Sequence, residues 1–194
     1  MGPDFLLVAN GGIQDYTDVA RVQQATGANA IMSSEGLLET PNLFVKSSYN
    51  LTPSVRFQQQ VTFAQDYMDL CHIIPPLPGV MGPRGSFNIV KGHLFKFLHR
   101  YFWDYPDMRN KLADHNHMYN LDHAQTWLDE LQSRYQHLED DEAWADLTSS
   151  NSESSWYRRH WKSKSRVHQR SIVLSKQQLR QRIAKLQEQR LMKG

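Results

Sequence analysis

The sequence predicts a short α/β segment, then an all-α region, and finally a basic tail. Residues 5–44 alternate apolar runs, glycine turns and one helical stretch, which is the pattern of a strand–helix–strand unit. Residues 61–147 carry apolar side chains at helical spacing, and residues 148–194 are rich in Ser, Lys and Arg. We therefore expect three parts, with boundaries at 1–60, 61–147 and 148–194.

The opening part predicts two parallel strands joined by a helix. Phe5–Ala9 is a continuous apolar run before a glycine turn, as expected of a strand buried on both faces of a sheet. A helix is predicted over Thr17–Thr26, with Gly27 following its last turn and an inner face made of Val19, Ala20 and Val22. Ala30–Met32 is the second predicted strand. Because one such unit cannot cover both faces of its strands, we expect this segment to be the end of a larger domain.

A glycine-containing turn follows each of these strands. Gly11 and Gly12 lack side chains, so their backbone can adopt a positive φ and approach an anion closely. The helix that follows directs its positive N-terminal end toward the same place. Ser34, Glu35 and Gly36 repeat the arrangement after the second strand. Either turn alone would be interpreted as an ordinary tight connection.

Four motifs in order resemble the end of the barrel domain of tRNA-dihydrouridine synthases, most closely the eukaryotic D-loop (16/17-type) subclass. They are NGGI at Asn10–Ile13, DV at Asp18–Val19, TGA at Thr26–Ala28 and MSSEGLLETPNLF at Met32–Phe44. A weaker match continues to about Trp103. The resemblance implies strands seven and eight of an FMN-binding (β/α)8 TIM barrel, followed by a helical tRNA-binding domain. On this basis, the chain is expected to be the C-terminal portion of such an enzyme.

The resemblance also implies the chemistry. Loops after strands seven and eight of such barrels commonly hold a phosphate, so the FMN phosphate is expected at Asn10, Gly11, Gly12, Ser34, Glu35 and Gly36. Glu35 departs from the arginine of many bacterial relatives, so we expect its backbone rather than its carboxylate to bind. The full enzyme would pass hydride from NADPH or NADH to FMN and then to uridine in tRNA, with a cysteine donating the proton. It is expected to be monomeric and cytoplasmic, with a nuclear location left open.

The catalytic cysteine is not expected in this chain, which alone is expected to be inactive. Cys71, the only cysteine, lies in an apolar run over residues 63–74 and is interpreted as a buried, inert thiol. No metal site is expected, because the histidines lack completing ligands at suitable spacing; these are His115, His117, His123 and His137. No stretch approaches the length of a membrane span, and Phe5–Ala9 is not a signal peptide.

The middle of the chain predicts helices around proline-rich connections. A linker over Val45–Pro53 precedes a helix over Phe63–Ile74, whose predicted inner stripe is Phe63, Tyr67, Leu70 and Ile74. After a loop over Ile73–Ser86, a helix over Ile89–Trp103 has an apolar face of Val90, Leu94, Phe97, Leu98, Tyr101 and Phe102. Its opposite side carries His93, Lys96, His99 and Arg100. The resemblance implies that this side faces tRNA. The alternative is that it is a solvated face of a bundle helix. Pro106 and Asp122 are expected to begin two more helices, with Asp122 and Gln125 forming a capping box.

Positive charge is concentrated in the tail of the chain. Residues 151–194 carry 12 Lys and Arg against 2 Asp and Glu, whereas residues 1–150 carry 10 against 18. Thr148–Ser155 is expected to be disordered, Trp156–Lys162 to contact phosphates and stack on unpaired bases, and Ser175–Met192 to form a terminal helix. The residues expected to bind RNA are Lys96, Arg100, Arg158, Arg159, Lys162 and Lys164.

Two other functions remain open at this point. The first is a non-catalytic RNA-binding remnant that keeps only the helical part and the tail. The second is another FMN barrel oxidoreductase acting on a small molecule, such as a dihydroorotate dehydrogenase-like enzyme. The helical extension and the basic, aromatic tail argue against the second, because a small substrate needs neither.

Overall fold

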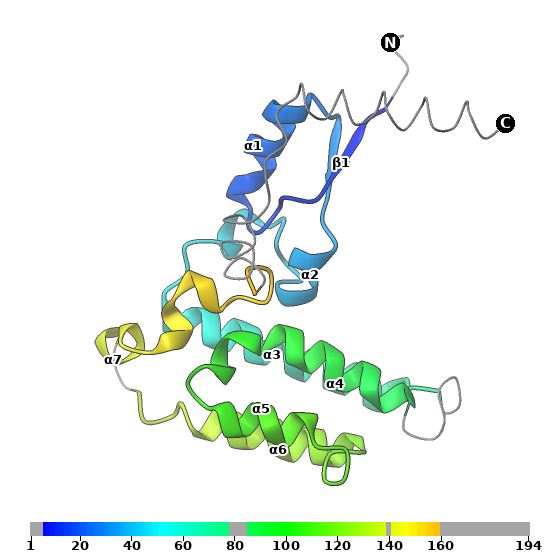
Figure 1. Ribbon diagram of the computed structural model, residues 1–194, viewed down its shortest axis with the longest axis vertical. Coiled ribbons are helices and arrows are strands. Elements are labelled where there is room, and N and C mark those ends of the chain that lie inside the picture. Colours follow the sequence, from blue (N-terminus) through cyan, green and yellow to red (C-terminus); the bar gives the residue numbers. More distant parts are fainter. Residues whose placement is uncertain (1–5, 78–84, 139–140, 160–194) are drawn as a thin grey trace, which may run out of the picture. The chain divides into compact units, whose positions relative to one another are not determined.

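The computed structural model describes residues 6–77, 85–138 and 141–159, which belong to one compact unit spanning residues 1–159 (Figure 1). Lys162, Lys164 and the terminal helix predicted over Ser175–Met192 lie outside the described residues, as does Phe5. The described chain contains one two-stranded sheet and is otherwise helical.

The opening segment forms the predicted strand–helix–strand unit. Strand β1 (Val8–Asn10) pairs in parallel with β2 (Ala30–Met32), and helix α1 (Thr17–Thr26) connects them. Helix α1 has the predicted bounds, and Gly27 ends it in the left-handed conformation at φ 67°, where its N–H donates to the Gln23 carbonyl at 2.9 Å. The prediction of two neighbouring parallel strands is confirmed, although the first strand begins at Val8 rather than Phe5.

The strands themselves are poorly covered. Leu6, Val8 and Met32 are 79%, 47% and 50% exposed, so the expected burial on both faces is not met within the described chain. Two strands and one helix offer too little surface to cover them, as the sequence argument anticipated. The small core of this segment consists of Ile13, Val22 and Leu43, whereas Ala20, predicted to face inward, is exposed.

After helix α2 (Glu35–Glu39) and the 3-10 helix η1 (Lys46–Ser48), the long helix α3 runs over Pro53–Ile73. The prediction placed its start ten residues too late, at Phe63. Thr52 caps the helix by accepting from the Val55 N–H at 3.4 Å, and Pro53 occupies the first turn, where it lacks only a donor that the helix does not use. The interpretation of Pro53 as the end of a linker missed this role.

The buried face of α3 also differs from the predicted one. The buried residues of α3 are Phe57, Gln60, Val61, Ala64, Met68 and Cys71. Leu70 and Ile74, in the predicted stripe, are instead 57% and 73% exposed, so that prediction is wrong for them, while Phe63 and Tyr67 are half-buried. Cys71 is buried, as expected.

Five further elements complete the helical bundle: α4 (Gly85–Phe97), the 3-10 helix η2 (His99–Phe102), α5 (Pro106–Ala113), α6 (Leu121–Ser133) and α7 (Asp141–Ala145). All six residues of the predicted apolar face over 89–103 are buried. The helices expected from Pro106 and Asp122 are present, but the cap of α6 is Asn120, whose side chain accepts from the His123 N–H at 2.8 Å. The predicted capping box at Asp122 is therefore wrong.

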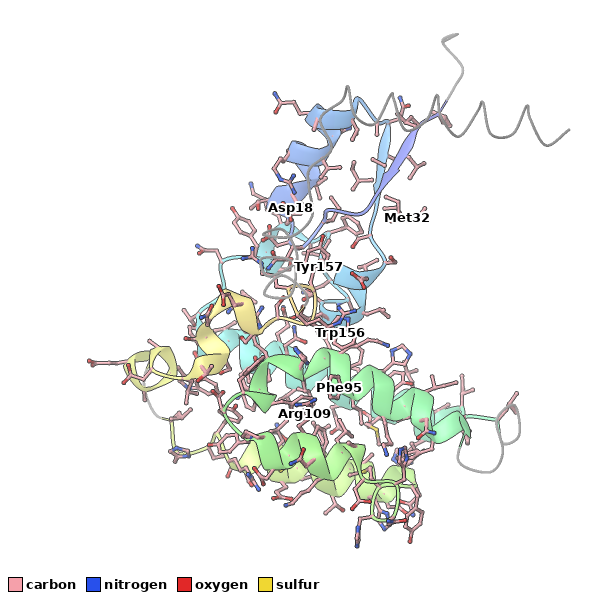
Figure 2. All side chains as sticks on the ribbon, in the orientation of Figure 1. Asp18, Met32, Phe95, Arg109, Trp156 and Tyr157 are labelled. Atoms are coloured by element: carbon pink, nitrogen blue, oxygen red, sulfur yellow. The ribbon has the colours of Figure 1, made fainter. Side chains whose placement is uncertain are left out.

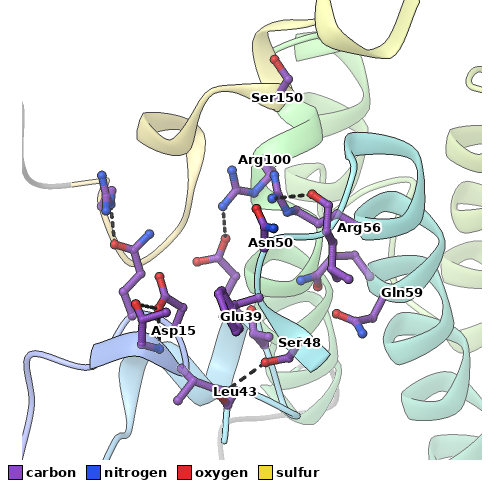
Figure 3. Close-up of a pocket in the computed structure, with 16 residues that line it drawn as sticks. Asp15, Glu39, Leu43, Ser48, Asn50, Arg56, Gln59, Arg100 and Ser150 are labelled. Atoms are coloured by element: carbon purple, nitrogen blue, oxygen red, sulfur yellow. Dashed lines mark hydrogen bonds and ion pairs between the residues drawn. The ribbon is translucent and has the colours of Figure 1, made fainter. Parts of the chain in front are cut away.

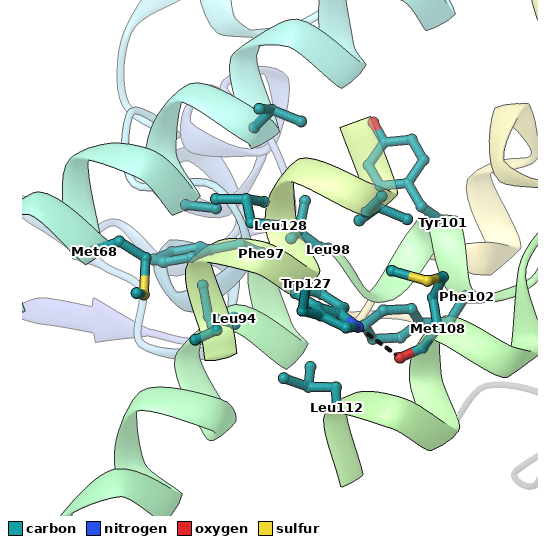
Figure 4. Close-up of a cluster of buried hydrophobic side chains, with 14 of the residues drawn as sticks. Met68, Leu94, Phe97, Leu98, Tyr101, Phe102, Met108, Leu112, Trp127 and Leu128 are labelled. Atoms are coloured by element: carbon teal, nitrogen blue, oxygen red, sulfur yellow. Dashed lines mark hydrogen bonds between the residues drawn. The ribbon is translucent and has the colours of Figure 1, made fainter. Parts of the chain in front are cut away.

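The bundle encloses the main hydrophobic core (Figure 4). In Figure 4, Leu94, Leu98 and Leu128 lie around Trp127, whose indole N–H donates to the Met108 carbonyl at 2.9 Å. At another part of this core, the Phe57 ring lies 4.4–5.2 Å, between ring centroids, from Tyr101, Tyr135 and Trp144. Burying each such side chain contributes about 1.5–3 kcal/mol, so this core supplies most of the hydrophobic stabilisation.

Residues 148–159 are ordered, so the predicted disorder of Thr148–Ser155 is wrong. They form the 3-10 helices η3 (Thr148–Ser150) and η4 (Ser152–Ser154). The Ser149 N–H donates to the Asp104 carboxylate at 3.1 Å, and the Ser154 hydroxyl donates to the Ser149 carbonyl at 3.2 Å. These hydrogen bonds help to hold the segment in place, and residues 148–159 belong to the same unit as residue 147.

Candidate functional site

The two glycine turns after β1 and β2 lie against each other, as expected for the ends of neighbouring parallel strands. The Ser33 hydroxyl donates to the Ile13 carbonyl at 3.4 Å. A Cβ atom at Gly36 would lie 2.7 Å from the Ile13 carbonyl oxygen and 2.6 Å from the Leu43 side chain, so only glycine fits here. Gly11 and Gly12 adopt φ of 98° and 72°, the conformation that the sequence allowed for them.

Backbone N–H groups at the first turn donate hydrogen bonds to other groups of the chain. The Gly11 N–H donates to the Met32 carbonyl at 3.2 Å, and the Gln14 N–H donates to the Asp18 carboxylate at 2.7 Å. Asp15 accepts from the Thr17 N–H at 2.9 Å. Burial opposes the charge of Asp18, but hydrogen bonds from Gln14 and Arg21 outweigh it and hold the pKa of this carboxyl below its ordinary value. Two carboxylates thus occupy the start of α1, where a phosphate was expected.

The second turn is more open to an anion. It leads directly into α2, and Ser34 makes no side-chain capping hydrogen bond there. The first amides of a helix have no intrahelical partner, so they remain available in principle. The Glu35 side chain is 54% exposed and pairs with Arg159 at 3.1 Å, rather than standing alone beside these amides. The six expected cofactor residues therefore fit a phosphate in part, through backbone at the second turn more than at the first.

The structure brings the predicted RNA-binding arginines onto these turns. The Arg158 Nε donates to the Gln14 side-chain oxygen, and Arg159 pairs with Glu35. Arg100 forms an ion pair at 3.6 Å with Glu39, whose other carboxylate oxygen accepts from the Tyr157 N–H at 3.1 Å. In Figure 3, Glu39 extends toward Arg100 across a cavity between α2 and the helical bundle. Arg100 therefore connects α2 to the bundle, and Arg158 and Arg159 connect the two turns to residues 148–159.

Lys96 and Trp156 meet on the polar side of α4. The Arg159 guanidinium lies 3.5 Å from the centroid of the Trp156 ring, and the Lys96 ammonium lies 5.9 Å from it. Phe95 and His99 contact the same ring edge-on, with centroids 5.8 and 5.5 Å away; Figure 2 labels Trp156 and Phe95. In this arrangement Trp156 covers α4 with a cation over its ring, rather than offering that face to a nucleobase.

His99, beneath Trp156, is held neutral. Burial, then the positive charges of Arg159, Arg109 and Arg100, lower the pKa of His99 to about 4. His99 therefore adds no positive charge to this surface at neutral pH. On the RNA face predicted over residues 89–103, the charge rests on Lys96 of α4 and Arg100 of η2, and the Arg100 side chain is only 11% exposed.

Sequence reasoning missed the cavity shown in Figure 3, of about 300 Å³, and its principal residues. Arg56, Gln59 and Gln60 line it from the first turns of α3, a stretch that lies between the predicted linker and the predicted helix and was assigned to neither. Glu39 was also missed, although it is a buried carboxylate at the end of α2. The signal was present in residues 53–60, where an N1 proline, Arg56 and Phe57 follow a capping threonine.

Within the described ranges, no group of three or more His, Cys, Asp or Glu side chains could hold a metal ion. Among the same residues, no helix has both the length and the apolar character needed to cross a membrane.

Three curated relatives resemble part of this chain. A fission yeast protein (Schizosaccharomyces pombe), tRNA-dihydrouridine(16/17) synthase, NAD(P)(+), is 28% identical over 109 residues, covering 56% of this chain and 26% of that protein. The corresponding "-like" proteins of mouse (Mus musculus) and rat (Rattus norvegicus) are 35% and 34% identical over 106 residues, covering 18% and 20% of their length. The matched region thus spans about a quarter or less of these relatives. No solved structure matches the chain.

Residues 4–136 match the sequence model of the dihydrouridine synthase (Dus) family. This match begins before the first strand, includes both glycine turns and continues through α6 to residue 136. The family match therefore covers both the strand–helix–strand segment and most of the helical bundle, whose side chains meet at Glu39 and Arg100. The chain belongs to the dihydrouridine synthase family.

Proposed function

We propose that this chain is the C-terminal part of a tRNA-dihydrouridine synthase, the activity named for its relatives. One observation carries the proposal: a single family match runs without interruption from the strand-end turns into the helical bundle, through residue 136. In the parts we propose, residues 1–60 are the end of an FMN-binding (β/α)8 barrel and residues 61–147 bind tRNA. Residues 148–194 are a basic extension, whose first part, to residue 159, is folded against both.

We propose that the chain contributes one edge of the FMN phosphate site, through the backbone of Asn10, Gly11, Gly12, Ser34, Glu35 and Gly36. The uncapped start of α2 supports this assignment more than the start of α1 does, because Asp15 and Asp18 already accept from amides there. When bound, the flavin would supply hydride to the C5–C6 double bond of uridine, having taken it from NADPH or NADH.

FMN binding gives a first test of the barrel assignment. Two strands do not close a barrel, so the chain by itself should not retain FMN. Purified protein should be colourless and release no stoichiometric flavin on denaturation. Yellow protein with one flavin per chain would contradict the assignment of residues 1–60 as a barrel end.

The six residues proposed to bind RNA fall into groups according to their contacts in the structure. Arg100, Arg158 and Arg159 hold Glu39, Gln14 and Glu35, so we assign them a positioning role and expect little direct contribution to affinity. Lys96 is half-buried near Trp156. Residues 160–194, which include Lys162 and Lys164, carry 10 Lys and Arg against 1 Glu. We therefore propose that phosphate contacts of this region supply most of the tRNA affinity.

The test compares the full chain with a chain ending at Arg159. A cut at residue 150 would be misleading, because it also removes Trp156 and thereby uncovers α4. Fluorescence anisotropy with labelled tRNA, repeated at several salt concentrations, should show a large loss of affinity and a shallower salt dependence for the shortened chain. Lys96→Gln in the full chain should cost much less. Unchanged affinity and salt slope in the shortened chain would return the RNA contact to the helical part.

The enzymatic part of the proposal is tested in cells. We expect tRNA from cells in which the gene encoding this chain is disrupted to lose dihydrouridine at one or more positions, detected by mass spectrometry of the tRNA. Reintroducing the gene should restore the modification. Dihydrouridine that is unchanged, while the purified chain still binds tRNA, would favour the non-catalytic RNA-binding protein, in keeping with a lone cysteine that is buried.

A further inference from the structure

The end of α3 carries large apolar side chains that point away from the bundle core. Leu70 and Ile73 lie on its last turn, and the Ile74 N–H still donates to the Leu70 carbonyl at 2.8 Å, so Ile74 continues the helical spacing. Residues three and four apart share a helix face, which places these three side chains together. Leu77 follows Ile74 by three residues, and Ile89 lies near the start of α4. All five residues are between 57% and 80% exposed.

These side chains form one surface, because α3 and α4 pack side by side. The Tyr67 ring lies 5.0 Å from the His93 ring and 5.9 Å from the Phe97 ring, between centroids. Figure 1 shows α3 ending and α4 beginning at the same end of the bundle, so the two helices run in opposite directions. The last turn of α3 therefore lies beside the turn of α4 that precedes His93, where Ile89 is found. This surface, the hairpin patch, consists of Leu70, Ile73, Ile74, Leu77 and Ile89.

The hairpin patch is large for a surface that faces water. Its five aliphatic side chains expose roughly 500 Å² of apolar area, which is comparable with the largest patch on a typical monomeric protein. Patches of this size mark places where another surface binds. The hairpin patch contains neither an aromatic ring on which a nucleobase could stack nor a cation for a phosphate. Its chemistry therefore favours an aliphatic protein surface over a nucleic acid.

Charged residues border the hairpin patch on opposite sides. Asp66 precedes Tyr67, and the rotation of about 100° per helical residue turns it away from α4 to the outer edge of α3, where it is exposed. Lys96 follows His93 by three residues and Ile89 by seven, so it shares their face of α4. The border is therefore acidic on α3 and basic on α4, at the level of the contact between Tyr67 and His93.

A surface of this kind is complementary to itself. A two-fold axis that lies in the interface, parallel to the helices, places one apolar patch on the other and sets each acidic border against a basic one. Asp66 of each copy then faces Lys96 of the other copy. A two-fold axis perpendicular to the helices would instead bring the two acidic borders together, which like-charge repulsion disfavours. The charges thus select one of the two arrangements.

We propose that the hairpin patch is a dimer interface, covered by the same patch of a second copy of this chain. Pairing two patches would bury roughly 1,000 Å² of aliphatic surface, and the charged borders bring the total to about 1,200 Å², the size of the smaller specific interfaces. A dimer of this size is expected to be reversible. The proposal is independent of the proposed tRNA function, and it differs from the monomer expected for the full enzyme.

Sedimentation velocity of the full chain tests the dimer. The sedimenting mass should rise from monomer toward dimer between about 1 and 100 µM. Ile74→Glu places a charge at the centre of the patch and should weaken dimerisation at least about tenfold. Val55→Glu, which changes an exposed apolar residue at the other end of α3, should change it less than about twofold. Circular dichroism should show both variants to be folded like the wild type, because both side chains are exposed.

Two results of this experiment would overturn the proposal. One is a chain that stays monomeric at about 100 µM. The other is an association that Ile74→Glu leaves unchanged, as expected of contacts made through the exposed strands instead. A chain that dimerises through the patch but binds no tRNA would contradict the proposed function and leave the dimer interface standing.

Charge reversal tests the arrangement of the two copies. Asp66→Lys and Lys96→Glu should each weaken the dimer by about threefold or more, because each replaces both reciprocal attractions by repulsions. The combined variant should recover dimerisation to within about twofold of the wild type, since the pairs are restored with opposite sign. Recovery would support the two-fold arrangement, whereas a combined variant that is weaker than either single one would overturn it.

Discussion

The strand–helix–strand segment and the helical bundle are built very differently. In the described chain, the core of the segment contains three buried residues, Ile13, Val22 and Leu43, whereas that of the bundle contains 21. Hydrophobic stabilisation scales with the apolar area buried, so the bundle supplies most of it. The segment has well-defined local geometry, with a helix ended by Gly27 and two positive-φ glycines, but little core of its own.

The difference teaches that precise local structure and stability can come from separate parts of one unit. The turns after β1 and β2 are joined to the rest of the unit through polar contacts. Glu39 forms an ion pair with Arg100 and accepts a hydrogen bond from the Tyr157 N–H. Glu35 pairs with Arg159, and the Gln14 side chain accepts a hydrogen bond from Arg158. A candidate site at these turns therefore depends on residues more than 100 positions away in the sequence.

The largest expected effect comes from emptying the bundle core. Phe57→Ala removes a ring that is 1% exposed and packs on Tyr101, Tyr135 and Trp144. It should lower the free energy of unfolding by about 3–5 kcal/mol, measured by urea denaturation. Val22→Ala, the matched truncation in the small core, should cost about 1–2 kcal/mol. Equal losses for both variants would mean that the two regions do not differ in the way proposed.

The next effect concerns the connection between the regions. Glu39→Gln removes the charge that faces Arg100 at 3.6 Å and leaves a mostly buried guanidinium without its counter-charge. The unfolding free energy should fall by about 2–3 kcal/mol. Glu35→Gln is the control. Because the Glu35 side chain that pairs with Arg159 is 54% exposed, this substitution should lower the unfolding free energy by less than about 1 kcal/mol. A Glu39 variant as stable as the Glu35 variant would show that Glu39 is not the connection.

His99 should make stability depend on pH. Its pKa is lowered from 6.5 to about 4 by burial and by nearby arginines, so the unfolded chain binds a proton in this range that the folded chain does not. The contribution is complete above pH 6.5 and is lost as the pH falls toward 4. Denaturation midpoints should therefore fall more between these values for the wild type than for His99→Gln. His137→Gln, which changes an exposed histidine, should keep the wild-type profile.

The smallest effect compares two candidate caps of α6. Asn120 accepts from the His123 N–H at 2.8 Å, so Asn120→Ala should cost about 1 kcal/mol. Asp122→Ala should cost less, because Asp122 is an exposed residue in the first turn rather than the cap. Thermal denaturation of both variants decides between them, and a larger loss for Asp122→Ala would favour the capping box that the sequence predicts.

Local signals in the sequence were sufficient for some elements and not for others. The bounds of α1 and its end at Gly27 follow from residues adjacent in the chain, as does the apolar face from Val90 to Phe102. The start of α3 was missed because Pro53 was interpreted as a break, although proline suits the first turn of a helix.

Properties set by distant contacts could not be predicted from local patterns. A serine-rich stretch resembles a disordered linker, yet the Ser149 N–H meets Asp104 and Ser154 meets Ser149. Nothing near Glu39 in the sequence indicates that Arg100 and Tyr157 will reach it. The glycine turns were located correctly, but the occupation of the first one by Asp15 and Asp18 emerges only from side-chain geometry.

Hydrogen–deuterium exchange, followed by mass spectrometry, tests most directly whether the segment depends on the bundle. Amides of β1, α1 and β2 should exchange through local opening, faster than those of α3, α4 and α6, which require opening of the main core. Glu39→Gln should accelerate exchange over residues 6–45 while leaving the relative protection of α6 unchanged. Equal protection in both regions, with every amide changing in step in the Glu39 variant, would contradict the account.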